Sequence, residues 1–315
     1  MNILIFGLGA LGTVYACLLK EAGHRVTVVA REAVKSTIKD QGVRVTGIWG
    51  NHESRPDQVV TGYDELVGEK FDIAVLTVKS FDTAEVALEL SKVLHKDTYI
   101  LLAQNGCGNY EAAAGHLPRE KVILGRVIFG SVTKATGEAQ VTAIADDVVI
   151  GSPEGLIDSA TVENFARVFS QAGIPTRTSD EVMKYVWAKI IYNSSLNALG
   201  ALFEVSYGQL AENIYTREMI DRVVKEIFGL LAAMGRETLW TDADTYLKEF
   251  YEVVIPRTAA HHASMLQDIR RGKKTEIDAL NGAVVQLGKE FDTATPVNEM
   301  LTLMVKAREQ FLLRS

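Results

Sequence analysis

The stretch from the N-terminus to Arg31 constrains the fold more than any other part of the chain. Residues Asn2–Phe6 form a short apolar run, typical of a strand buried on both faces of a parallel sheet. A helical stretch at Thr13–Ala22 and a second apolar run at Arg25–Ala30 complete a predicted βαβ unit. The six residues between the first strand and the helix fit the pattern G-x-G-x-x-G without an insertion: Gly7, Leu8, Gly9, Ala10, Leu11 and Gly12.

Each glycine of this pattern has a physical role. Gly7 permits a tight turn, Gly9 lets a pyrophosphate approach the backbone, and Gly12 lets the helix lie close to the strand. The N–H groups and the dipole at the start of the helix attract the negative charge of the pyrophosphate. A glycine pattern alone is weak evidence. Its place between a buried strand and a helix predicts a dinucleotide site formed by residues 7–12.

Arg31 indicates which dinucleotide binds. Proteins that bind NAD usually have Asp or Glu at the end of the second strand, where the carboxylate holds the ribose 2′-hydroxyl. This chain has Arg31 there, and a guanidinium pairs with a 2′-phosphate through two hydrogen bonds. The residues therefore favour NADP(H) as the cofactor. The alternative is a solvated arginine at a strand end, beside Glu32.

Composition argues against several classes of protein. The chain has 315 residues, a net charge of −7 and no long basic run, so we expect no nucleic-acid partner. Cys17 and Cys107 are too few for a disulfide framework or a cysteine metal site, and no metal is expected. No apolar stretch approaches the length of a membrane span, and no signal peptide is recognised. We therefore expect a cytoplasmic protein.

Two later strands are predicted to end at polar residues. The apolar run Phe71–Val78 leads into Lys79, and the run Thr98–Ala103 leads into Gln104 and Asn105. In a doubly wound sheet, ligands bind beyond the carboxyl ends of the strands. Lys79 is thus a candidate for a phosphate or ribose, and Asn105 for ribose or substrate. A surface lysine and a turn-forming Asn-Gly pair are equally good interpretations.

The alternation of strands and helices stops near Thr178. Apolar runs at Val122–Val132, Ala139–Ile144 and Val148–Ile150 indicate further strands, and a helix ends at Gly173. From Thr178 onward the periodicity is helical. We predict an α/β domain with a Rossmann-type doubly wound sheet at residues 1–179 and an all-helical domain at residues 180–315. The sheet order of residues 40–70 and 120–150 is left open.

One predicted helix of the second domain has an unusual polar face. Lys189, Asn193 and Asn197 are spaced i, i+4 and i+8, so they share one face. Such spacing usually marks a solvent-facing stripe. The flanking residues are apolar, however, and amides are less common on a solvated face than Glu or Lys. The pattern therefore favours a face that lines a ligand site.

Together these motifs resemble the ketopantoate reductase (2-dehydropantoate 2-reductase) family. The resemblance includes GLGALG, Arg31, the VKS and QNG strand ends, WAKIIYNSSLN at Trp187–Asn197, and SMLQDIR with TEID at Ser264–Asp278. It implies NADPH-dependent reduction of 2-dehydropantoate to (R)-pantoate, a step toward pantothenate and coenzyme A. The alternatives are a reductase of a different 2- or 3-oxo acid on the same architecture, or a non-catalytic NADP(H) sensor.

The resemblance also assigns roles to single residues. Lys189 matches the proton donor of the family, and Glu276 matches an acid near the nicotinamide ribose and the lysine. Substrate-binding positions match Asn105, Lys189, Asn193, Asn197 and Ser264. Cofactor-binding positions match Gly7, Leu8, Gly9, Ala10, Leu11, Gly12, Arg31, Lys79, Asn105 and Glu276, with Ser131 in backbone contact with the nicotinamide end. The expected partner is a small 2-oxo acid.

Two residues depart from the family pattern on the substrate side. His261 stands where the family has a substrate-binding Asn, and Tyr207 stands at a position where it can have another. A helix predicted at Thr258–Arg270 would place His261 and Ser264 on one face, so His261 is included among the substrate-binding candidates. A protonated His261 would bind a carboxylate, whereas a His261 turned to the surface would not. Long helices with apolar faces are compatible with a homodimer.

Overall fold

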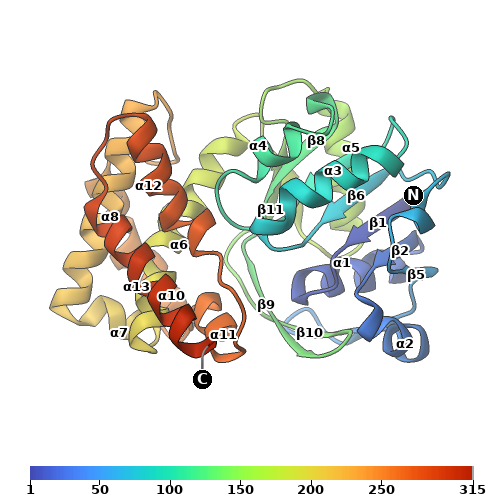
Figure 1. Cartoon of the computed structure of the whole chain (residues 1–315), viewed down its shortest axis with the longest axis horizontal. Helices are drawn as coiled ribbons and strands as arrows, with labels where there is room; N and C mark the ends of the chain where they lie inside the picture. The colour runs from blue at the N-terminus through green and yellow to red at the C-terminus, as the bar shows by residue number, and fades with distance from the viewer. Residues whose placement is uncertain (314–315) are drawn as a thin grey trace. The chain divides into compact units, whose positions relative to one another are not determined.

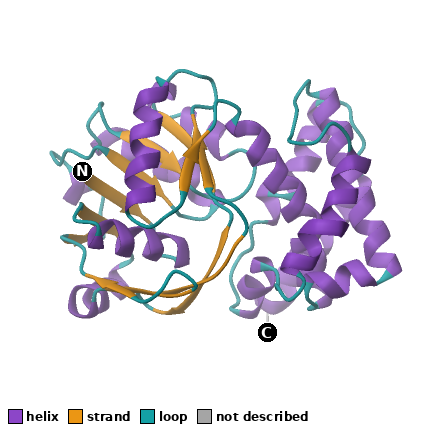
Figure 2. Cartoon of the chain, turned by 180° about the vertical axis from the view of Figure 1, so that it is seen from behind, coloured by secondary structure: helices purple, strands orange, loops and turns teal. Residues whose placement is uncertain are grey.

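The computed structural model describes residues 1–313 and divides the chain into two compact units (Figure 1). The first unit consists of Met1–Asn105 and Asn109–Val182, and the second of Gly106–Gly108 and the chain from Met183 onward. The first unit contains strands and helices, whereas the described part of the second contains only helices and loops (Figure 2). The predicted fold class, an α/β part followed by an all-α part, is confirmed.

An eight-stranded sheet forms the centre of the first unit. Its order is β12-β11-β8-β7-β6-β1-β2-β5, and the strands from β8 to β5 run parallel, while β11 pairs with β8 antiparallel. The chain moves outward from β1 in one direction and then returns to build the other half from β6, which is the doubly wound arrangement. The strands are β1 (Asn2–Phe6), β2 (Arg25–Val29), β5 (Gln58–Val60), β6 (Ile73–Leu76), β7 (Tyr99–Leu102), β8 (Val122–Arg126), β11 (Val148–Gly151) and β12 (Thr176–Thr178).

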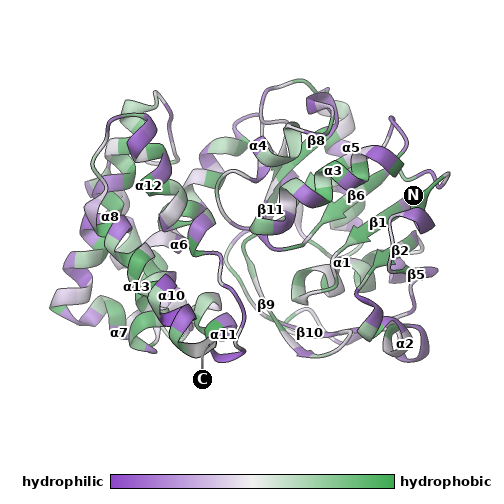
Figure 3. Ribbon diagram, viewed as in Figure 1, coloured by the Kyte–Doolittle hydropathy of each residue, from purple (hydrophilic) through white to green (hydrophobic). Residues whose placement is uncertain are grey.

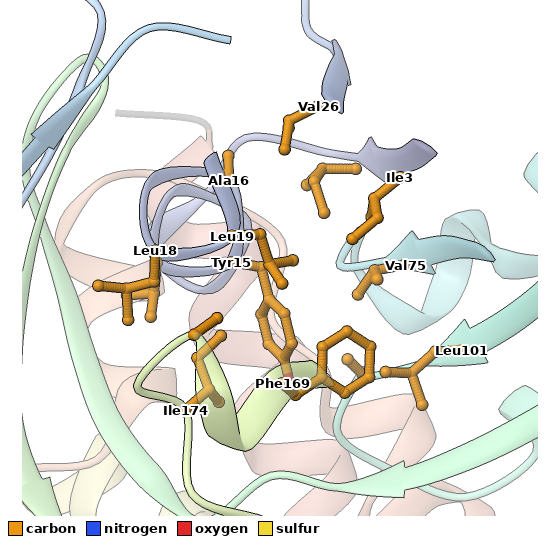
Figure 4. Packing of buried hydrophobic residues seen from close by; sticks show 14 of the residues in the cluster. Ile3, Tyr15, Ala16, Leu18, Leu19, Val26, Val75, Leu101, Phe169 and Ile174 are labelled. Carbon is orange, nitrogen blue, oxygen red and sulfur yellow. The ribbon is translucent and has the colours of Figure 1, made fainter. Parts of the chain in front are cut away.

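Helices cover the sheet with apolar side chains. Tyr15 and Phe169 meet edge to face at 5.7 Å, and they pack with strand residues such as Ile3, Val75 and Leu101 (Figure 4). The alternate strand residues are buried as well, as expected for parallel strands covered on both faces, and these strands are hydrophobic along their length (Figure 3). The helices of this unit are α1 (Ala10–Glu21), α2 (Glu32–Gln41), α3 (Thr83–Val93), α4 (Asn109–Ala114) and α5 (Ser159–Gln171).

A second sheet of four strands lies in the first unit, in the order β4-β3-β10-β9. Its strands are β3 (Val43–Gly47), β4 (His52–Ser54), β9 (Phe129–Ala135) and β10 (Glu138–Ile144). The single strand predicted at Val122–Val132 is therefore wrong, because β8 and β9 belong to different sheets. Both segments contain buried apolar residues. Apolar character alone therefore does not show where the chain passes from one sheet to the other.

The second unit packs its helices around α6, which is buried at most positions from Trp187 to Ala201. A helix that is apolar on nearly every side belongs in the interior of a helical domain. Within the described residues, no helix is long and apolar enough to cross a membrane. The helices are α6 (Val182–Phe203), α7 (Tyr207–Glu212), α8 (Ile214–Ala233), α9 (Ala243–Glu249), α10 (Ile255–Thr258), α11 (Ser264–Arg270), α12 (Asn281–Glu290) and α13 (Pro296–Leu313).

The helix predicted at Thr258–Arg270 is wrong in its first part. Helix α10 ends at Thr258 and α11 begins at Ser264, with a loop between them that contains His261. The backbone carbonyls of Ala259 and His261 accept hydrogen bonds from the N–H groups of Gly208 and Tyr207 in α7, at 2.9 and 3.0 Å. These carbonyls therefore bond to another helix instead of continuing their own.

Candidate active site

The glycine turn of the first unit has the geometry that a pyrophosphate requires. Gly7 has a φ of +99°, which favours glycine. A Cβ on Gly12 would lie 1.9 Å from the Gly7 carbonyl oxygen, so only glycine allows α1 to approach β1 this closely. A Cβ on Gly9, in contrast, would have no described atom within 4 Å, so the space beside Gly9 is open.

The start of α1 also suits an anion. Gly9 is the N-cap, no side chain caps the helix there, and its first turn contains no acidic residue. The carbonyl of Gly7 is held by the Thr77 hydroxyl, which donates to it at 2.7 Å. The fixed turn and the N–H groups at the helix start fit the pyrophosphate of a dinucleotide.

Arg31 lies two residues after the end of β2 and is exposed at the N-cap of α2. No side chain in the described part of the chain pairs with its guanidinium, whereas the nearby Lys35 approaches Glu65 at 3.7 Å. The Arg31 guanidinium therefore retains its hydrogen-bond donors for a ligand. The preference for NADP(H) that Arg31 indicates in the sequence remains a prediction.

The structure brings the segments of Lys79 and Asn105 together. Strands β6 and β7 are parallel neighbours, with Leu76 paired to Leu102, so both segments leave the sheet at the same edge. The Ser80 hydroxyl donates to the Asn105 carbonyl at 2.5 Å, which joins the residue after Lys79 to the Asn105 turn. The strand-end prediction thus identified two segments that are in contact.

A buried polar network behind Asn105 was missed by the sequence analysis. Asn109 donates from Nδ2 to the Asn105 carbonyl at 2.8 Å and accepts at Oδ1 from the Thr83 hydroxyl at 3.0 Å. Gln104 donates in turn to Thr83 at 2.7 Å. The network fixes the main chain at Asn105. Its sequence signal is the set of amide side chains that follows an apolar strand, Gln104, Asn105 and Asn109, and spacing alone does not show that they bond to one another.

Ser131 lies on β9 of the second sheet, is half-buried, and is in register with Val141 of β10. Among the described residues, no hydrogen bond joins Ser131 to the glycine turn or to the Asn105 segment. Its contact with the nicotinamide end remains a prediction.

In the second unit, the polar face of α6 is buried. Asn193 is 8% exposed and Asn197 is 4% exposed, while Lys189 is half-buried. This burial excludes a solvent-facing role for the two amides. No described residue forms a hydrogen bond with the Asn193 side chain, so its donor and acceptor remain for a ligand.

Tyr207 and His261, the two departures from the family pattern, contact each other. Their rings lie 5.3 Å apart, and the Tyr207 hydroxyl donates to Asn197 Oδ1 at 2.7 Å. Burial, together with the nearby charge of His262, lowers the pKa of His261 below its usual value, so the neutral ring is favoured. Ser264 is exposed at the first position of α11. The shared helix face expected for His261 and Ser264 is absent, because His261 lies in the preceding loop.

Glu276 is half-buried at the N-cap of a short 3-10 turn, Ile277–Ala279, in the same unit as Lys189. The fully buried Asn281 follows this turn and donates from Nδ2 to the Ser194 carbonyl of α6 at 3.0 Å. The segment that contains Glu276 is therefore tied to the helix that contains Lys189. Sequence periodicity gave no sign of this bond, because it joins two distant segments.

Comparison with known proteins finds similar sequences over the whole length of the chain. Residues 3–155 match the profile described as ketopantoate reductase PanE/ApbA, and residues 181–309 match that of its C-terminal part. A 2-dehydropantoate 2-reductase of Aquifex aeolicus (strain VF5) is 48% identical over 314 residues, which cover 100% of this chain and 99% of the relative. The enzyme of the same name from Pyrococcus abyssi (strain GE5 / Orsay) is 32% identical over 309 residues, 98% of either chain.

A solved structure is similar over its full length. A PanE/ApbA family ketopantoate reductase from Ralstonia eutropha JMP134 aligns with a TM-score of 0.88 at 28% identity, and the alignment covers 99% of both chains. The likeness thus extends across both units.

Proposed function

Since this chain belongs to the ketopantoate reductase family, we propose that it reduces 2-dehydropantoate to (R)-pantoate with NADPH, using Lys189 as the proton donor. The chain is an oxidoreductase, and the expectation of an enzyme instead of a non-catalytic sensor is confirmed. The observation that carries the proposal is the α6 face, where a half-buried lysine is followed by two buried amides.

The first unit would hold the cofactor through its own backbone and side chains. The glycine turn at residues 7–12 receives the pyrophosphate, and Arg31 pairs with the 2′-phosphate that distinguishes NADPH from NADH. Lys79 and Asn105 contribute polar groups at the carboxyl ends of β6 and β7. When bound, NADPH supplies a hydride to the carbonyl carbon of the substrate.

The second unit would complete the reaction with a proton. A lysine is protonated at neutral pH, so Lys189 polarises the ketone and then donates its proton to the oxygen as the hydride reaches the carbon. The products are a secondary alcohol and the oxidised cofactor, and solvent reprotonates the lysine. Glu276 orients the ammonium group of Lys189. Asn193, Asn197 and Ser264 bind the carboxylate and hydroxyl oxygens of the substrate without adding charge.

A different oxo acid is the second candidate substrate. The Tyr207–His261 pair favours it, because an aromatic pair beside Asn197 replaces the two amides that the family pattern leads us to expect. This alternative uses the same cofactor and the same proton donor, and only the shape of the accepted side chain differs. The expected homodimer and cytoplasmic location also remain predictions.

The experiment is NADPH oxidation with ketopantoate beside smaller and larger 2-oxo and 3-oxo acids, at matched enzyme concentration. The proposal predicts the highest kcat/KM for ketopantoate. A higher value for another oxo acid would assign the chain to that substrate. Absence of turnover with every oxo acid, together with tight NADPH binding, would refute the proposed reaction.

A further inference from the structure

We propose that Tyr207 is a positioning residue that orients the Asn197 amide, so that Asn197 presents its NH₂ group to an oxygen of the bound 2-oxo acid. The inference rests on the proposed function for the identity of the ligand. It adds a residue that contributes to substrate recognition through another side chain.

The contact between Tyr207 and Asn197 is buried and well placed. Tyr207 is 2% exposed, and its hydroxyl donates to Asn197 Oδ1 at 2.7 Å. It is the first residue of α7, which begins with a capping box in which the Ser206 backbone N–H donates to Gln209 Oε1 at 3.0 Å. The cap fixes the start of α7 and hence the origin of the Tyr207 side chain.

The direction of this hydrogen bond decides what Asn197 offers to a ligand. An asparagine amide has one carbonyl acceptor and one NH₂ donor. Burial raises the pKa of Tyr207 well above its usual value, so its hydroxyl keeps its proton and remains a donor. Because the Asn197 carbonyl is already bonded to Tyr207, the group left for a ligand is the NH₂ donor. Its complement is an oxygen acceptor, such as a carboxylate or hydroxyl oxygen.

Neighbouring groups hold the Tyr207 ring in place. Tyr192 meets it edge to face at 5.9 Å, and His261 lies against it at 5.3 Å. The Tyr207 N–H donates to the His261 carbonyl at 3.0 Å, so the loop before α11 is bonded to the backbone of the same residue. These contacts restrict the ring and favour the position in which its hydroxyl bonds to Asn197.

Asn193 indicates why the orientation of the Asn197 amide matters for substrate binding. It lies one helical turn before Asn197 on the same face of α6, is 8% exposed, and its amide has no hydrogen-bond partner among the described residues. One amide on this face is therefore fixed, and the other is adaptable. Lys189 lies a further turn away on the same face, so we expect the ligand whose ketone meets Lys189 to reach Asn197 through a second oxygen.

The test is a double-mutant cycle on Tyr207 and Asn197. Tyr207→Phe removes only the hydroxyl and keeps the ring packing. For the oxo acid that the wild type reduces best, its KM should rise roughly 2- to 12-fold, the range for one neutral hydrogen bond, with NADPH affinity unchanged. Asn197→Ala should also raise KM, and adding Tyr207→Phe to it should cause no further rise.

A matched control separates positioning from packing. Tyr246→Phe removes a hydroxyl from another fully buried tyrosine of the same aromatic cluster, and it should leave KM unchanged. An unchanged KM in Tyr207→Phe would overturn the inference. A rise in KM that adds fully to that of Asn197→Ala would overturn it as well, because it would place the effect of Tyr207 elsewhere.

A second measurement does not depend on turnover. In protein labelled with ¹⁵N at asparagine, the side-chain NH₂ resonances of Asn197 are identified by their loss in Asn197→Ala. The inference predicts one defined pair in the wild type that shifts or broadens in Tyr207→Phe and stays in place in Tyr246→Phe. An unaffected pair would refute the positioning role even if ketopantoate proves to be the wrong substrate, so the two failures are distinguishable.

Discussion

Alanine substitutions at Gly9 and Gly12 should separate cofactor binding from folding. At Gly9 the backbone has φ −78° and ψ −167°, which alanine adopts without strain, and the added Cβ meets no described atom within 4 Å. A Gly→Ala change at a compatible position stabilises a protein by about 0.4–1 kcal/mol. Gly9→Ala should therefore keep or slightly raise the melting temperature of the ligand-free protein. Its methyl group should obstruct the pyrophosphate and weaken NADPH binding at least ~10-fold, about 1.4 kcal/mol.

Gly12→Ala should have the opposite effect and destabilise the ligand-free protein. Its Cβ would lie 1.9 Å from the Gly7 carbonyl oxygen and 2.6 Å from Thr77 Oγ1, so α1 must move away from β1. Overpacking of this kind costs about 1–3 kcal/mol or more. For a domain of this size, each kcal/mol lowers the melting temperature by roughly 2–4 °C. We therefore expect a loss of roughly 2–12 °C without any ligand.

Thermal unfolding with and without NADPH measures both effects. At a ligand concentration of about 100 times Kd, the wild type should gain about 2.7 kcal/mol of stability. Gly9→Ala should lose about half of that gain, or more, at the same NADPH concentration. A Gly9→Ala variant that binds NADPH like the wild type would refute the assignment of the open space beside Gly9 to the pyrophosphate. A Gly12→Ala variant of normal stability would refute the packing argument.

Three further predictions follow from single side chains. Arg31→Ala should weaken NADPH by about 1.5–3 kcal/mol and leave NADH binding unchanged in equilibrium titrations, and equal losses for both would make Arg31 structural. Because burial and the charge of His262 lower the pKa of His261, the ring is neutral between about pH 6.5 and pH 8, so His261→Asn should not change how KM varies with pH in that range. A difference between the two profiles there would place a titrating His261 at the substrate. Hydrogen bonds from Arg270 and Arg308 lower the pKa of Glu204. The ionised Glu204 therefore stabilises the folded protein above its unfolded pKa, and this contribution is lost as the pH falls through its lowered folded pKa. The Glu204→Gln variant should melt at a lower temperature than the wild type at neutral pH. It should lose less stability than the wild type when the pH falls below about 4.5.

The glycine turn and the two strand ends could be predicted because each depends mainly on residues that are near one another in the sequence. The Gly7 turn and the Gly12 contact follow from a pattern that has one physical solution between a buried strand and a helix. The contact of the Lys79 and Asn105 segments followed from a topological rule, that neighbouring parallel strands end at the same edge. Neither required knowledge of the rest of the fold.

The tertiary contacts could not be predicted in this way. The residues around His261 favour a helix locally, but backbone hydrogen bonds from Gly208 and Tyr207 interrupt it. These two donors lie in a helix about fifty positions earlier in the sequence. The hydrogen bond between Tyr207 and Asn197 likewise has no periodic pattern in the sequence that would predict it. Sequence spacing placed Asn197 on the correct face of its helix, whereas its partner depends on how α6 and α7 pack.

The most direct test of the account is the single-turnover rate of Lys189→Ala with NADPH and the preferred oxo acid. The matched control is Lys184→Ala, which removes a lysine of the same helix that pairs with Glu237 at 2.9 Å. Lys189→Ala should lower the rate roughly 10²- to 10⁴-fold with NADPH affinity intact, the usual contribution of a positioned acid, and Lys184→Ala should leave the rate near that of the wild type. A Lys189→Ala enzyme that turns over at a near-normal rate would contradict the assignment of the α6 face to catalysis.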